Sequence, residues 1–242
     1  MQQQTPHPER ITSKTIWHGL LDIFNLERGL IYTVVALTTK PGAALREYLY
    51  ENRKKLVPPF RFLIFTVAIG TFLTLQYFKY NELAQLFETG FKQGAEQEDL
   101  SDRGQEFLQA YMKGITYIYN NYFNVFLLAG VPIMALMTFW LWRKKMNYAE
   151  HLVINSYLTS YLTLIYIVMM PILWLSDYMK LSILYFIGSL IYSAYFYIQV
   201  FQEKIGRGIF KTFIVNLLYL LAYYILVIII FIVAAIILMP KN

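Results

Sequence analysis

The chain has 242 residues, of which 57% are hydrophobic and 15% are charged, and its formal net charge is +6. This composition is typical of a membrane protein and is too apolar for an ordinary soluble domain. The absence of cysteine excludes disulfides, zinc ribbons, haem-thioether attachment and thiol catalysis.

Five apolar runs follow one another along the chain, and each meets the requirement of roughly 20 residues for a helix that crosses the bilayer core. Lipid offers no hydrogen-bond partner to backbone amides, so these runs must be helical. We therefore expect an all-α fold, a polytopic transmembrane helical bundle of about five spans. Residues 1–58 would form a cytoplasmic or interfacial amphipathic region, and residues 59–242 the transmembrane domain. The runs cover residues 60–78, 122–142, 151–175, 181–201 and 213–239.

The basic residues are divided unequally between the two predicted sides of the membrane. Residues 1–61, 143–150 and 202–212 hold 15 of the 21 Lys and Arg residues. Cytoplasmic loops carry such an excess, so these segments are expected in the cytoplasm of a bacterial inner-membrane protein, and an odd number of spans places the C-terminus outside. We assign the positive charge to topology and to anionic lipid headgroups, with RNA contact as the minor alternative.

Short amphipathic stretches precede the first run. Residues 15–25 and 29–37 are too short to span, and Pro41 suits the first turn of a further helix that reaches about Asn52. These stretches are interpreted either as helices lying in the cytoplasmic interface or as ordinary core packed on the membrane domain. The candidate contacts to lipid headgroups are Arg46, Arg53, Lys54, Lys55, Arg143, Lys144 and Lys145.

Residues 79–121 form a long outside loop that carries more acidic than basic side chains. Apolar residues recur at helical spacing between Phe107 and Ile118, so we expect a helix that Asp102 caps, with a weaker helical stripe before it. The predicted helices lie over the outer leaflet or the bundle, and a partner-binding face is the alternative.

The run at 151–175 has a polar face although no acidic residue or lysine lies deep in any run. The candidate interhelical face comprises His151, Asn155, Thr159 and Thr163, flanked by Ser156 and Ser160. Hydrogen bonds between helices are the favoured interpretation, and a lined cavity is the alternative. Glu150 is expected to cap this span at its positive N-terminus, and His151 to bond across to a neighbouring loop. No catalytic, cofactor or metal site is predicted.

Three stretches together resemble the bacterial membrane family known as domain of unknown function 3667, which is common in Bacteroidota. Members commonly carry a zinc ribbon before the first stretch, and a chain without cysteine lacks it. They also tend to have further histidines after the Glu-His pair, where this sequence has Ser156, Tyr157 and Thr159. The stretches are Arg10-Ile11-Thr12 leading to Glu27-Arg28-Gly29, Thr33, Lys40-Pro41-Gly42 and Arg46-Glu47-Tyr48; Asn52-Arg53-Lys54-Lys55 with Pro58-Pro59; and Val131-Pro132 through Arg143-Lys144-Lys145 to Tyr148-Ala149-Glu150-His151-Leu152-Val153.

The scarcity of ionisable groups at depth orders the functional hypotheses, because proton-coupled pumps and intramembrane proteases need such groups. The first is a non-enzymatic subunit or helper of a larger membrane complex, with membrane-protein partners. The alternative is a transporter or channel whose path is lined by the third span. The third hypothesis is an enzyme acting on lipid through Glu150 and His151.

Overall fold

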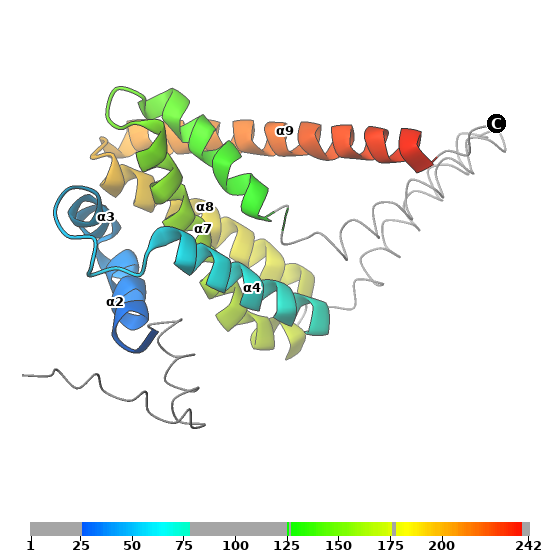
Figure 1. Ribbon diagram of the computed structural model, residues 1–242, viewed down its shortest axis with the longest axis horizontal. Coiled ribbons are helices and arrows are strands. Elements are labelled where there is room, and N and C mark those ends of the chain that lie inside the picture. Colours follow the sequence, from blue (N-terminus) through cyan, green and yellow to red (C-terminus); the bar gives the residue numbers. More distant parts are fainter. Residues whose placement is uncertain (1–25, 78–124, 126, 176–177, 239–242) are drawn as a thin grey trace, which may run out of the picture.

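The structure is a computed structural model and describes residues 26–77, 125, 127–175 and 178–238. Every regular element in these ranges is an α-helix, which confirms the all-α prediction. The helices are α2 (Leu26–Thr39), α3 (Pro41–Tyr50), α4 (Pro59–Tyr77), the helix Leu127–Trp142, α7 (Tyr148–Leu175), α8 (Tyr178–Val200) and α9 (Ile205–Leu238) (Figure 1).

Three helices are long and apolar enough to cross a membrane, which makes this chain a membrane protein with three candidate spans. They are Tyr148–Ile172, Ile183–Val200 and Ile205–Leu226. Shorter apolar helices account for the two earlier predicted runs, namely Pro59–Thr74 and Leu127–Trp142. A total of five spans therefore remains a prediction, and the predicted helices within 15–25 and 79–121 lie outside the described residues.

Two helix boundaries bear on the predictions. The helix predicted from Pro41 is confirmed as α3, with the proline in its first turn where no backbone N–H is needed. The expectation that 202–212 is a loop was wrong, because α9 already begins at Ile205. Arg207 and Lys211 therefore occupy the first two turns of a helix whose remainder is strongly apolar, and Glu203 and Lys204 immediately precede it.

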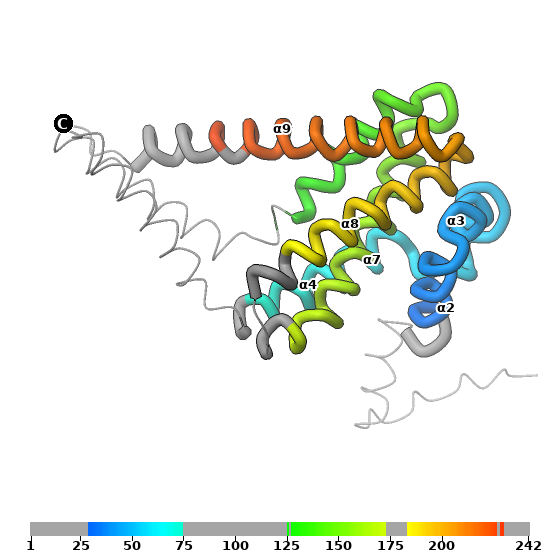
Figure 2. The backbone as a smooth tube through the Cα atoms, turned by 180° about the vertical axis from the view of Figure 1, so that it is seen from behind, coloured from blue at the N-terminus to red at the C-terminus, as the bar shows by residue number. Residues whose placement is uncertain are grey.

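The centre of the fold is α7, which lies between α4 and α8 (Figure 1). Helix α8 also packs against α9 and α3, so it connects the bundle to the last helix and to the N-terminal helices. Figure 2 shows α2 and α3 at the end of the bundle where α8 turns into α9, while α9 runs away from the other helices at a wide angle.

The buried core lies mainly at this end and is rich in aromatic side chains. Tyr157 of α7 is fully buried, its ring meets Tyr48 of α3 edge-on at 5.4 Å, and its hydroxyl donates to the backbone oxygen of Val57 at 2.7 Å. The backbone N–H of Val57 donates to Thr33 of α2. A buried tyrosine with a satisfied hydroxyl thus ties α7 to α3 and to the turn before α4.

The outer surfaces of α4, α8 and α9 expose large apolar side chains, which only a bilayer or another apolar partner can cover. Examples are Ile64 on α4, Ile191 on α8 and Phe213 on α9, each at least 60% exposed. Within 29–74, 127–172 and 183–229, the charged side chains are confined to 40–61, 143–150 and 203–211. These segments lie at one end of the molecule (Figure 1). This is expected when the charged segments between spans gather at one surface of the membrane.

The helices α2 and α3 dock on α8 through its backbone and its tyrosines. At the end of α2, the carbonyls of Leu37 and Thr39 accept hydrogen bonds from the hydroxyls of Tyr192 and Tyr195, at 2.9 and 2.8 Å. The final four carbonyls of any helix lack partners within the helix, so these bonds replace water. Packing of α2 and α3 on the membrane domain, one of the two interpretations of this region, is thus observed, and their placement in the interface remains a prediction.

Gly42 allows the closest approach between α3 and α8. A Cβ atom placed on it would lie 2.3 Å from the backbone oxygen of Gln199, far inside van der Waals contact. The same Gln199 oxygen accepts a 2.7 Å hydrogen bond from the Arg46 guanidinium, so a displacement of α3 would strain this bond as well.

We expect Gly42→Ala to lower the free energy of unfolding by about 1–3 kcal/mol, since backbone atoms would have to move apart. The matched control is Gly188→Ala in α8, where an added Cβ meets nothing within 4 Å and alanine should be neutral or stabilising by up to about 1 kcal/mol. Thermal unfolding in detergent measures both. Equal effects of the two substitutions would contradict the close contact.

Candidate functional site

The N-terminus of α7 is fixed by a reciprocal pair of hydrogen bonds. The Asn147 side-chain oxygen accepts from the backbone N–H of Glu150 at 3.0 Å, and the Glu150 carboxylate accepts from the backbone N–H of Asn147 at 2.7 Å. This is a capping box, and it confirms the predicted role of Glu150 at the helix N-terminus. The cap also sets the position of His151 on the following turn.

A fully buried polar cluster, comprising Thr138, His151, Asn155 and Tyr197, joins three helices. The Asn155 amide donates to the Thr138 hydroxyl at 2.9 Å, and the Tyr197 hydroxyl donates to the Asn155 side-chain oxygen at 2.6 Å. The His151 ring contributes Nδ1 at 3.1 Å from the same Thr138 oxygen. All four residues are 0% exposed, so the cluster crosslinks α7 to α8 and to the helix Leu127–Trp142.

The proton count of this cluster favours one tautomer of His151. Thr138 has a single hydroxyl proton, and its geometry allows donation to the Ala135 carbonyl at 3.0 Å. Its oxygen then accepts from Asn155, and it accepts from His151 as well when the ring proton is on Nδ1. The remaining ring nitrogen, Nε2, is buried and has no hydrogen-bond partner.

Aromatic rings enclose the cluster on the charged side of the fold. Phe201 stacks on His151 with 5.1 Å between ring centroids, and Phe139 meets the imidazole edge-on at 5.8 Å. Trp142 in turn stacks on Phe201 at 4.4 Å. These rings exclude water from the imidazole, so the cluster has the character of a dry interior and not of an open active-site cleft.

Beyond the rings lies a charged cluster centred on Glu203, whose side chain is only 7% exposed. Its carboxylate lies 3.2 Å from the Lys145 ammonium and 3.0 Å from that of Lys211, and it accepts a hydrogen bond from the Trp142 indole at 3.1 Å. Burial alone would raise the pKa of Glu203, but the hydrogen bonds from Lys211 and Lys145 outweigh it and hold the pKa below its ordinary value. Glu203 is therefore ionised at neutral pH.

The structure separates the residues of the predicted polar face into three groups. Asn155 and His151 bond to other helices, and the partner of His151 lies in the helix Leu127–Trp142, so the expected bond to a neighbouring loop was wrong. Ser156 and Ser160 donate to carbonyls of the preceding turn of α7. Thr159 and Thr163 are only half-buried, and whether the face lines a path remains a prediction.

The candidate headgroup residues also occupy different environments. Arg46 donates to the Gln199 and Val200 carbonyls, and Lys145 binds Glu203 and the Phe201 carbonyl. Lys55 forms an ion pair with Glu47. Arg53, Lys54, Arg143 and Lys144 are exposed, which leaves these four best placed to meet lipid headgroups.

Sequence reasoning missed the partners of the polar face. Thr138 is one hydroxyl in an apolar run, and Tyr197 is one of 21 tyrosines in the chain, so neither stands out by type. Glu203 carried a usable signal, because an acidic residue that follows a predicted span and is itself followed by basic residues is suited to an ion pair. In the ranges that the structure describes, no group of three or more potential metal ligands occurs.

Comparison with known proteins gives one partial match. The model of a family described as "Protein of unknown function (DUF3667)" matches residues 27–70. This segment contains α3 and nearly all of α2, with the turn that follows and the first part of α4. Neither the curated proteins nor the solved structures contain a match to the chain.

The matched segment is the part of the fold that docks on α7 and α8. Thr33 accepts the Val57 N–H, Gly42 touches the Gln199 backbone, and Arg46 bonds to the end of α8. The resemblance stated from the sequence is thus supported for this segment, while the bacterial lineage and the lost zinc ribbon remain predictions.

A double-mutant cycle with Asn155→Leu and Tyr197→Phe measures the crosslink between α7 and α8. We expect each substitution to destabilise the protein and the pair to show a coupling energy of about 0.6–1.7 kcal/mol, the range for hydrogen bonds between membrane helices. Unfolding in mixed micelles with increasing denaturing detergent supplies the free energies.

The control cycle pairs Tyr197→Phe with Ser160→Ala, because Ser160 donates within its own helix. These two substitutions should be additive. Additivity in the Asn155–Tyr197 cycle as well would show that the 2.6 Å contact contributes nothing.

Proposed function

We propose that this protein is a non-enzymatic helper or subunit of a larger bacterial inner-membrane complex, built on five spans. The observation that carries the proposal is the closure of the polar cluster. Its four residues are fully buried, bond mainly to one another, and are enclosed by Phe139, Trp142 and Phe201. Groups arranged in this way hold helices together, whereas a substrate site needs groups that a substrate can reach.

The exposed apolar surface supports the same conclusion from the outside. On α9, Leu221, Tyr224, Ile225 and Ile228 are each at least half exposed, and this helix extends away from the bundle (Figure 2). Such a helix offers partner spans a long face for packing, because van der Waals contact drives helix association in lipid.

Transport through the third span is the second candidate, and the unpartnered Nε2 of His151 is the observation in its favour. A hydrogen-bonding atom without a partner in a dry interior is costly and is a place where a donor molecule would be stabilised. Asn155 lies one turn further along the same helix, so its substitution by leucine would disturb any such path.

One experiment separates the two candidates. The tagged protein is purified from native membranes in mild detergent, as wild type and as Asn155→Leu, and both are assayed for co-purified proteins and for ion and solute flux in liposomes. We expect the same set of stoichiometric partners with both forms and no flux. A wild-type protein that purifies alone and supports a flux lost in Asn155→Leu would replace the helper by a transporter.

The orientation that we propose places the charged end of the fold, including Lys144, in the cytoplasm. Because the chain has no cysteine, single substitutions Lys144→Cys, Gln97→Cys and Asn242→Cys report sidedness through a membrane-impermeant maleimide. We expect labelling of Gln97→Cys and Asn242→Cys in intact spheroplasts, and of Lys144→Cys only after permeabilisation. Protection of Asn242→Cys would contradict the odd number of spans.

A further inference from the structure

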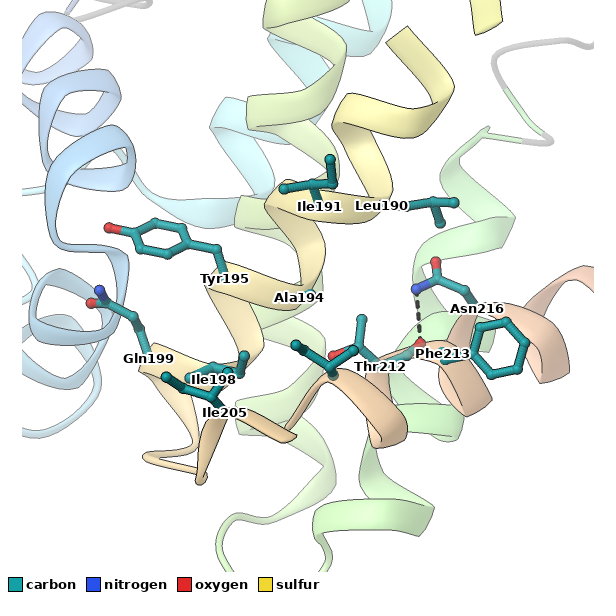
Figure 3. Close-up of a pocket in the computed structure, with 11 residues that line it drawn as sticks. Leu190, Ile191, Ala194, Tyr195, Ile198, Gln199, Ile205, Thr212, Phe213 and Asn216 are labelled. Atoms are coloured by element: carbon teal, nitrogen blue, oxygen red, sulfur yellow. Dashed lines mark hydrogen bonds between the residues drawn. The ribbon is translucent and has the colours of Figure 1, made fainter. Parts of the chain in front are cut away.

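An apolar groove of about 630 Å³ runs between α8 and α9 (Figure 3). Ala194 and Ile198 of α8 form part of one wall, and Ile209 and Phe213 of α9 form part of the other. The groove belongs to two candidate spans, so the surrounding medium is the bilayer. Whatever fills it is therefore apolar over most of its length.

The groove is long and is lined mainly by apolar side chains. Along α8 it extends from Leu190 to Gln199, which is roughly 13 Å of helix. A lipid acyl chain is long, thin and apolar, and the bilayer around the two candidate spans supplies such chains in excess.

One end of the groove meets the corner between α2 and α3. Tyr195 and Gln199 line the groove and point toward these helices (Figure 3). The Tyr195 hydroxyl donates to the Thr39 carbonyl, and Gln199 packs on Gly42. Lys40, which lies between these two contacts in the sequence, is exposed.

The same end carries positive charge on the α9 side. Lys204 is exposed and immediately precedes Ile205, which lines the groove. The neighbouring carboxylate of Glu203 is already bound to Lys145 and Lys211. Lys40 and Lys204 thus both adjoin, in the sequence, residues at the same end of the groove, and the nearest acidic side chain in the sequence is already paired.

We propose that the groove binds one anionic phospholipid, with an acyl chain between α8 and α9 and the phosphate at Lys40 and Lys204. This goes beyond the helper function, which requires no particular lipid. Charge complementarity at one end and an apolar channel leading away from it match the two chemically distinct parts of such a molecule.

The test uses the full chain, delipidated in neutral detergent and then mixed with dioleoyl-phosphatidylglycerol or dioleoyl-phosphatidylcholine, with native mass spectrometry to count retained lipid. We expect one phosphatidylglycerol per protein to survive and phosphatidylcholine to dissociate. Lys40→Gln with Lys204→Gln should weaken retention about 25-fold, at about fivefold for each cation. The control pair, Arg143→Gln with Lys144→Gln, removes two exposed charges that face headgroups of the bilayer in general and do not line the groove, so retention of the single groove lipid should change little.

A second pair of variants tests the groove itself. Ala194→Trp fills it and should abolish retention, whereas Ile187→Trp, on exposed α8 surface outside the groove, should not.

Equal retention of the two lipids, equal effects of the two charge pairs, or a crosslinked second copy seated in the groove would each overturn the lipid site. If Ala194→Trp fails to fold, the charge pairs still decide. Loss of the lipid site would leave the co-purified partners unchanged, so its failure is distinct from failure of the helper function.

Discussion

The fold depends on pairing the free carbonyl groups at helix ends with side chains of other elements. At the end of α2 the acceptors meet tyrosine hydroxyls of α8, and at the end of α8 they meet Arg46 and Lys145. Each of these bonds joins elements that are distant in sequence. Pairing of helix ends, a local requirement of the backbone, thereby becomes the tertiary structure of the charged end.

The polar cluster extends the same logic into the bundle. Asn155 occupies both its amide and its carbonyl in contacts with α8, the helix Leu127–Trp142 and the preceding turn of α7. Each such bond contributes little net free energy in a membrane, but an unmade one leaves a polar atom in a medium with no substitute partner. An arrangement of the helices that breaks these bonds therefore loses more free energy than the native arrangement gains from making them. The main effect of the cluster is that it specifies one arrangement of the bundle.

The sequence was informative where one residue type dictates one behaviour. Long apolar runs predict helices, Pro41 predicts a first turn, and Glu150 predicts a cap, because each depends on local geometry. The docking of α2 and α3 could not be chosen over the interface, since amphipathicity is the same whether the apolar face meets lipid or protein. The partners Thr138 and Tyr197 could not be identified because a hydroxyl carries no mark of what it bonds to.

Basic residues show the same ambiguity in another form. Arg46 and Lys145 resembled headgroup ligands by charge and position, yet Arg46 binds a carbonyl of α8, and Lys145 binds the Phe201 carbonyl just after α8 and the Glu203 carboxylate. Both uses satisfy the same chemistry, a cation beside oxygen atoms at the edge of an apolar layer. Only the three-dimensional arrangement separates an arginine that holds a helix end from one that faces lipid.

The length of α9 gives the molecule a mechanical property. Its 34 residues extend about 50 Å, well beyond a hydrocarbon core of about 30 Å. Its first turns are held by the bonds between Lys211, Glu203 and Trp142, and Tyr219 lies against Gly130 near its middle. The helix is therefore held over its first half, and the part beyond Tyr219 is a lever of about 28 Å, so a rotation of about 5° at that contact would sweep the tip through roughly 2.5 Å.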